Sequence, residues 1–199
     1  MSRGKIALLT IFLVLLADQV LKILIKTHMM LGQEIRIADW FIIHFTENNG
    51  MAFGMELGGS IGKMILSLFR VVAVIAIGIY VVYLIKQKSS TGLIVSMSLI
   101  LAGALGNIVD SLFYGMIFTD SYYQVAQAFP SSGGYSSFLH GKVVDMFYFP
   151  LFSGHFPSWL PIWGGEEFEF FRPVFNIADS AITVGVAIIL IFQKKYFKD

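Results

Sequence analysis

Four long apolar windows, separated by more polar segments, dominate the hydropathy pattern of the chain. They cover about residues 6–25, 61–85, 91–113 and 175–192. A membrane-spanning helix needs about 20 mainly apolar residues, with a range of roughly 17–25, and each window fits. We therefore predict an all-α membrane protein with four transmembrane helices, forming a single membrane-embedded domain over residues 1–199.

Lysine and arginine residues gather in three places that lie on one side of this topology. They precede the first window, fill the link after the second and follow the fourth: Arg3, Lys5, Lys86, Lys88, Lys194, Lys195 and Lys198. The positive-inside rule then places both termini in the cytoplasm. The segments of about 27–60 and 114–174 face outward. The first window lacks a following small-x-small cleavage site, so we expect a retained helix.

The two outer segments differ in pattern. Residues 34–45 are β-branched and aromatic with partial alternation, which indicates strands, and Asn49-Gly50 is typical of a hairpin turn. The second outer segment is rich in aromatic residues, Gly and Pro. We expect a small extracytoplasmic β-rich platform and a long aromatic outer loop at the lipid interface, where aromatic rings settle. A loop without fixed structure would fit the same composition.

Composition supports the membrane assignment. The chain is 56% hydrophobic and 14% charged, whereas a soluble domain has roughly 45–50% apolar and about 25% charged residues. The absence of cysteine excludes disulfides, thiol catalysis and thiolate metal sites. A formal net charge of +1 gives no reason to expect nucleic-acid binding.

Four aspartates approach the same outer level of the predicted membrane. Asp18 lies in the outer half of the first window, Asp110 at the end of the third and Asp179 at the start of the fourth. Asp145 lies between them in the apolar run KVVDMFYF. Ionisable residues within spans are rare, cost about 2.5–3.5 kcal/mol when central, and are usually functional. Their shared depth predicts a site built from converging carboxylates.

Amide and lysine side chains accompany three of these aspartates. Residues three or four apart share a helix face, which pairs Asp18 with Lys22, Asn107 with Asp110, and Asn176 with Asp179. The small residues of AGALGN let another helix approach closely. The second pair equally fits hydrogen bonding between helices. The third fits the N-cap and N3 positions of a capping box, and both roles can hold at once.

Asp145 and Asp179 would meet if the loop between the last two windows folds back. Two close carboxylates resist double ionisation, so that one keeps its proton. Such a pair can activate water with one member and protonate a leaving group with the other, without a metal. Other hydrolytic motifs are missing: no GxSxG or Walker loop appears, and HExxH spacing is absent among His28, His44, His140 and His155.

Five short motifs follow one another along the chain. They are DQxxK at Asp18–Lys22, NNGMAFG at Asn48–Gly54, GALGNIVD at Gly103–Asp110, VVDM at Val143–Met146 and FNIADS at Phe175–Ser180. The motifs occur in this order over nearly the whole chain, which in this respect resembles the lipoprotein signal peptidases, the signal peptidase II family. Each motif alone is weak, whereas five in order on a four-helix pattern are specific.

The resemblance implies a membrane aspartic endopeptidase. It would remove signal peptides from diacylglyceryl-modified prolipoproteins, cutting just before the lipidated cysteine, with Asp145 and Asp179 as the catalytic pair and no cofactor or metal. Substrate- or inhibitor-binding and supporting residues would be Asp18, Lys22, Asn48, Gly50, Asn107, Asp110 and Asn176. It also implies membrane lipid and the cyclic peptide globomycin as ligands, a monomer, and a bacterial cytoplasmic membrane location with the active site at the outer face.

Two departures and two alternatives accompany this resemblance. Ser111 stands where the family usually has Arg, which removes a cation that usually neighbours Asp110. Residues 111–142 are also longer than the usual link. That segment forms either a lid or a surface decoration. A cation-coupled transporter would use intramembrane acids too, but such sites usually lie at the midplane between repeats. A structural scaffold would explain the spans but not the motifs.

Overall fold

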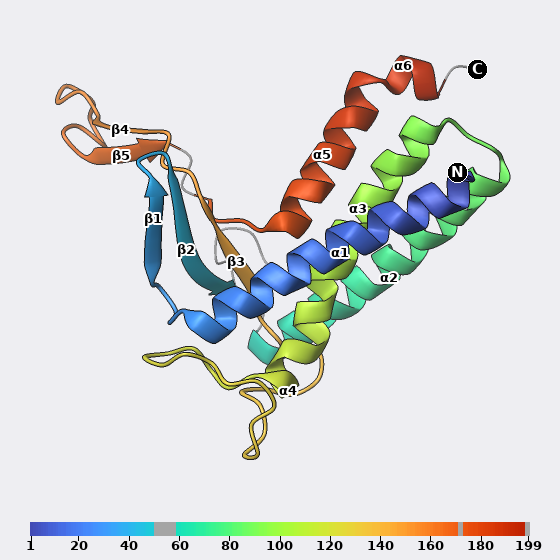
Figure 1. The fold of residues 1–199 in the computed structure, drawn as a ribbon. Coiled ribbons are helices and arrows are strands. Elements are labelled where there is room, and N and C mark those ends of the chain that lie inside the picture. The colour runs from blue at the N-terminus through green and yellow to red at the C-terminus, as the bar shows by residue number, and fades with distance from the viewer. Residues whose placement is uncertain (50–58, 171–172, 198–199) are drawn as a thin grey trace.

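The computed structural model describes residues 1–49, 59–170 and 173–197, and it is mostly helical (Figure 1). The main helices are α1 (Arg3–His28), α2 (Gly59–Lys86) and α3 (Thr91–Val109). A π-helical turn (Asp110–Tyr114) and the short α4 (Gly115–Ile117) continue α3. Three stretches are long and apolar enough to cross a membrane: Arg3–His28, Ile61–Lys86 and Thr91–Ile117. These match the first three predicted windows.

The fourth predicted window is shorter in the structure than expected. It corresponds to α5 (Ile177–Ile191), whose 15 residues fall below the about 20 that a spanning helix needs. The helix is interrupted at Phe192 and resumes as α6 (Gln193–Tyr196). At the other end, Asn176 caps α5 from outside, so the predicted start at residue 175 was two residues early. The start of α1 and α6 lie at the same end of the molecule (Figure 1).

Helix α3 is the centre of the helical region and contacts α1, α2 and α5. Half of its apolar window is buried, compared with 11% for α2, whose apolar side chains face outward. Glycines allow the close contact with α5, as the AGALGN run predicted. A Cβ on Gly103 would lie 2.2 Å from the Ala178 carbonyl oxygen, and one on Gly106 would lie 2.7 Å from Asp18 Oδ2.

The predicted β-rich platform is a three-stranded antiparallel sheet in the order β1-β2-β3. Its strands are β1 (Glu34–Ala38), β2 (Phe41–Asn48) and β3 (Val143–Tyr148). The turn between β1 and β2 lies at Asp39-Trp40, whereas the expected turn residue Gly50 lies outside the described residues. The expectation that Asp145 lies in a loop was wrong. The run VVDMFY pairs with β2, placing Asp145 opposite Thr46.

The outer segment after β3 contains a second, smaller sheet. Strands β4 (Phe152–His155) and β5 (Glu167–Phe170) form an antiparallel hairpin. Phe152 and Phe170 stack at 4.5 Å between ring centroids, and Phe156 lies 4.9 Å from Phe168. Figure 1 shows this hairpin projecting beyond the helices. The stretch that we expected to be a long aromatic loop is therefore partly strand.

The π-helical turn connects the helices with the sheet. A wider turn releases backbone carbonyls from the helical ladder, and residues 139–141 use them. Leu139 N donates to Leu112 O at 3.3 Å, and Gly141 N donates to Ser111 O at 2.9 Å. One buried apolar cluster then joins this turn, the end of α1 and the sheet: Ile25, Met29, Phe45, Tyr114, Phe118, Ala126, Val144 and Met146.

Candidate active site

Asp145 lies on β3, with only 3% of its surface exposed. Its Oδ1 accepts a hydrogen bond from Asn176 Nδ2 at 2.6 Å, and its Oδ2 accepts one from Asn48 Nδ2. Burial, reinforced by the neighbouring Asp179 carboxylate, raises the pKa of Asp145 to about 7. Protonation of this carboxyl is therefore favoured at a higher pH than protonation of an exposed aspartate.

Asn176 joins the two candidate catalytic aspartates. Its Oδ1 accepts from Asp179 N at 2.9 Å, while its own backbone N donates to Asp179 Oδ2 at 3.4 Å, which completes a capping box at the start of α5. Its Nδ2 donates to Asp145 as described above. The predicted capping box is confirmed, and the same side chain also bonds to Asp145, so that the helix cap and the candidate site share one residue.

Asn107 holds the other side of Asp179. Its Nδ2 donates to Asp179 Oδ1 at 2.8 Å, and its Oδ1 accepts from Lys22 Nζ at 2.9 Å and from Asn176 Nδ2 at 3.1 Å. The spacing along α3 had suggested that Asn107 would support Asp110. Its side-chain bonds instead run to residues of α1 and α5, as in the alternative of hydrogen bonding between helices.

Lys22 is the cation at the centre of this network, and its side chain is fully buried. The ammonium lies 3.0 Å from Asp18 Oδ2, 2.8 Å from Asp110 Oδ2 and 2.9 Å from Asn107 Oδ1. Three acceptors match the three N–H bonds of an ammonium. The predicted pairing of Asp18 with Lys22 is confirmed, and Asp110 joins it as a second carboxylate.

Asp18 and Asp110 act on the backbone that carries the candidate pair. Asp18 Oδ1 accepts from Ala178 N at 2.9 Å, in the first turn of α5. Asp110 Oδ2 accepts from Val144 N at 3.2 Å, next to Asp145 in β3. The four aspartates thus divide into two that carry the candidate chemistry and two that orient the elements bearing it.

Two supporting residues were not among the predicted site residues. Gln19 Nε2 donates to Asp18 Oδ2 at 3.1 Å and to Asp110 Oδ1 at 3.0 Å. Gln19 Oε1 accepts from the buried Tyr114 hydroxyl at 3.2 Å. The position of Gln19 between Asp18 and Lys22 was a usable signal. No signal in the sequence pointed to Tyr114, because its side chain reaches the site only through the π-helical turn.

Gly50 lies outside the described residues. The structure also bears on the replacement of the usual Arg by Ser111. Ser111, which replaces the usual Arg, donates from Oγ to Asn107 O at 3.0 Å and so binds within its own helix. A cation from another element is nevertheless near, because Arg70 of α2 interacts electrostatically with Asp179 and Asp145.

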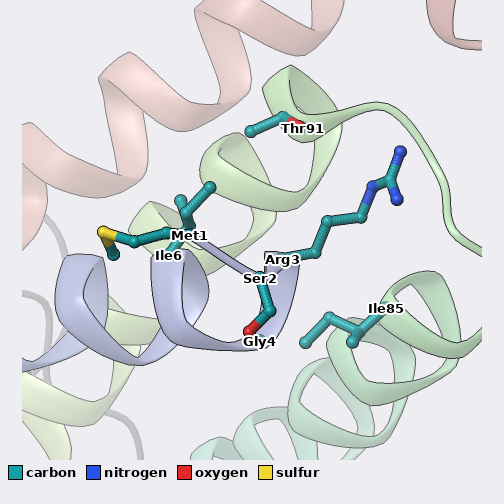
Figure 2. A pocket seen from close by; sticks show the side chains of 7 residues that line it. All are labelled: Met1, Ser2, Arg3, Gly4, Ile6, Ile85 and Thr91. Atoms are coloured by element: carbon teal, nitrogen blue, oxygen red, sulfur yellow. The ribbon is translucent and has the colours of Figure 1, made fainter.

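A cavity of about 480 Å³ lies at the other end of the helices (Figure 2). It is bordered by the start of α1, the end of α2 and the start of α3, through Met1, Ser2, Arg3, Gly4, Ile6, Ile85 and Thr91. Of the predicted site residues that the structure describes, none lines it. The candidate active site is therefore the buried network of aspartates, asparagines and Lys22.

Together, these features define a membrane protein whose helices carry a buried carboxylate site. Residues 10–194 match the family model described as signal peptidase (SPase) II. Lipoprotein signal peptidase of Porphyromonas gingivalis (strain ATCC 33277) is 54% identical over 192 residues, covering 96% of this chain and 84% of that protein. Lipoprotein signal peptidase of Amoebophilus asiaticus (strain 5a2) is 40% identical, covering 92% and 75%.

Solved structures of similar fold support the same assignment. Two structures of a bacterial membrane enzyme, obtained by the in meso method at 2.3 and 1.9 Å, align with TM-scores of 0.62 and 0.61. They are 26% and 28% identical to this chain, and the alignments cover 97% of it and 91% and 93% of those chains. The chain belongs to the signal peptidase II family and is therefore a peptidase, which sets aside the transporter and scaffold alternatives.

Proposed function

We propose that the protein is an aspartic endopeptidase that removes the signal peptide from diacylglyceryl-modified prolipoproteins, cutting before the lipidated cysteine. Family membership and two relatives named lipoprotein signal peptidase support the substrate class. The observation that carries the mechanism is the hydrogen-bonded unit of Asp145, Asn176 and Asp179, in which one asparagine bonds to both aspartates.

The two aspartates differ in environment, and this difference assigns their roles. Asp145 is buried, and its pKa is raised to about 7, so it holds the shared proton. Asp179 is partly exposed, so that water can reach its carboxylate, and Asn107 and the Asn176 backbone hold its two oxygens in place. Asp179 is accordingly the base and Asp145 the acid.

The reaction follows from these roles. Asp179 takes a proton from water as the water oxygen attacks the scissile carbonyl carbon. Asp145 gives its proton to the leaving amide nitrogen, and the C–N bond breaks. The products are the signal peptide with a new carboxylate and the lipoprotein with a free amine on its modified cysteine. Neither a metal nor a covalent intermediate takes part.

The arrangement of the helices supports the proposed topology. The chain would cross the cytoplasmic membrane of a bacterium four times, with α5 as the short fourth span and both termini inside. The site would then lie at the outer face, where a diacylglyceryl anchor presents the cleavage site. Lipid would surround a monomer. Globomycin would occupy the same site as the substrate, contacting Asn48, Gly50 and the catalytic pair.

The test is cleavage of a lipidated precursor by purified protein in detergent or nanodiscs. Asp145→Asn and Asp179→Asn should each nearly abolish cleavage while folding is retained, because Asn has the same size but no exchangeable acidic proton. The double variant should be no worse than either single one, since the pair acts as a unit. Asp39→Asn, at a side chain that is 97% exposed, is the control. A folded Asp179→Asn variant with near-normal cleavage would refute the mechanism.

A further inference from the structure

A second buried charge cluster, formed by Lys26, Glu47 and Lys142, lies next to the candidate active site. Lys26, one turn after Lys22 on α1, is fully buried and ion-paired with Glu47 of β2, which is 2% exposed. Lys142 lies 3.4 Å from the other oxygen of Glu47. Removing such charges from water is costly unless they are paired, so this cluster requires an explanation.

Residues 118–142, the greater part of the long link that the sequence left unexplained, supply most of the cluster's contacts. Ser121 Oγ accepts from Lys26 Nζ at 3.0 Å and donates to Glu47 Oε1 at 3.2 Å. The Tyr135 ring lies 5.0 Å from the Lys26 ammonium and 5.7 Å from that of Lys142. Burial raises the pKa of Tyr135, and its neutral hydroxyl accepts from Lys142 N at 2.7 Å.

The segment is docked on the end of α3, as Figure 1 shows beside α4. A Cβ on Gly134 would lie 2.1 Å from Gly115 O, and one on Gly141 would lie 2.0 Å from Asp110 O. No methyl group fits at either contact. Ser121 O also accepts from Leu31 N at 3.0 Å, which ties the segment to the connection after α1.

Strand geometry links this cluster to the catalytic pair. Successive side chains of a strand point to opposite faces. Glu47 therefore points to the cluster while Asn48, the next residue of β2, points to the site and donates to Asp145. We propose that residues 118–142 and the Lys26–Glu47 pair form a positioning element, which holds β2 so that Asn48 is aligned with the catalytic pair. This inference rests on the proposed function.

The effect has a predictable sign. The Asn48 hydrogen bond stabilises the ionised form of Asp145 and so lowers its pKa. Misplacing Asn48 therefore raises the pKa of Asp145 and moves the alkaline limb of the pH–rate profile upward. Merely removing the negative charge of Glu47 would act in the opposite direction, because a nearby anion disfavours ionisation. The direction of the shift separates the two causes.

The decisive experiment is a double-mutant cycle with kcat, KM and pH profiles for a lipidated precursor. Glu47→Gln should lower kcat on the order of tenfold to 100-fold, the cost of a misplacement of about 1 Å. Its alkaline limb should move in the same direction as that of Asn48→Ala. In the Asn48→Ala background, Glu47→Gln should add little, because it acts through Asn48.

Two further variants keep the test decisive. Ser121→Ala changes no charge, so a smaller upward shift of its alkaline limb would support positioning even if Glu47→Gln failed to fold. Gln124→Ala, at an exposed side chain of the same segment, should match the wild type. Two results would overturn the inference. One is that Glu47→Gln still lowers kcat twofold or more in the Asn48→Ala background. The other is that Ser121→Ala leaves the alkaline limb of the pH–rate profile unmoved. Wild-type protein that does not cleave the precursor would instead overturn the proposed function.

Discussion

Lys22 and Lys26 lie one turn apart on α1, and both are fully buried, yet their surroundings differ. Lys22 faces two carboxylates and an amide, which come from α1 itself, α3 and the π-helical turn. Lys26 shares the single carboxylate of Glu47 with Lys142. The first cluster thus carries an excess of acid and the second an excess of base. A buried lysine by itself does not mark a candidate active site, and the excess of acid around Lys22 is what distinguishes the first cluster from the second.

Removing each lysine should give the largest measurable difference between the clusters. Lys22→Met leaves Asp18 and Asp110 buried without their ammonium, which should cost about 3–5 kcal/mol and abolish cleavage. Lys26→Met leaves Glu47 with Lys142 and Ser121, so the cost should be closer to about 1–3 kcal/mol. Denaturant unfolding in micelles would measure both. Equal losses in the two variants would contradict the distinction.

The pH dependence of cleavage by the wild type should report the titration of Asp145, beside the first cluster. Asp145, with its pKa raised to about 7, must be protonated to act as the acid, so kcat should fall as pH rises through about 7. Above that pH it should fall about tenfold per unit, as for the loss of a single required proton. The profile of kcat against pH for the wild type measures this. A plateau extending to pH 9 would show that Asp145 is not the acid.

The tight packing between α3 and its neighbours should give a smaller effect. Gly106→Ala places a Cβ 2.7 Å from Asp18 Oδ2 and 3.1 Å from Ala178 Cβ. Overpacking of this kind costs about 1–3 kcal/mol, and here it displaces a carboxylate of the first cluster. Gly78→Ala is the matched control, since a Cβ there meets nothing within 4 Å. Gly106→Ala should lower both the thermal unfolding temperature and the rate of cleavage, and Gly78→Ala should change neither.

The smallest effect on stability and cleavage should come from an exposed ion pair. Arg36 Nη1 lies 3.5 Å from Asp39 Oδ1, and both side chains are largely exposed. Pairs of this kind contribute little, because water already solvates both charges. Arg36→Gln should therefore leave unfolding and cleavage unchanged. A clear loss of activity would show that β1 contributes to substrate binding, which none of its contacts indicates.

The sequence predicted the members of the first cluster better than their connections. Hydropathy predicted four spanning helices, of which three are long and apolar enough to span in the described part of the chain, and it placed Asp18, Asp110 and Asp179 near helix ends that meet. It did not show that Asn107 bonds across to Asp179, because i, i+3 spacing describes only one helix. It also assigned Asp145 to a loop, since a six-residue apolar run becomes a strand only when β2 lies beside it.

The second cluster could not be predicted at all. Lys26, Glu47 and Ser121 lie far apart in the sequence, and none belongs to a motif of recognisable spacing. Their meeting depends on how residues 118–142 fold against the end of α3. A lysine at the end of an apolar window is normally explained by the membrane surface, where its ammonium would reach water. Only the packing of Tyr135 and Phe118 around it shows that it is buried.

The capping box at Asn176 has a consequence for biosynthesis. The side chain that starts α5 is also the one that bonds to Asp145, and it is synthesised after α1, α2, α3 and β3. Until α5 has packed against α3, Asp145 lacks Asn176 and Asp179 as neighbours. Under the proposed mechanism, a chain in which α5 has not yet packed is inactive toward neighbouring membrane proteins, and it gains peptidase activity only once this helix is in place.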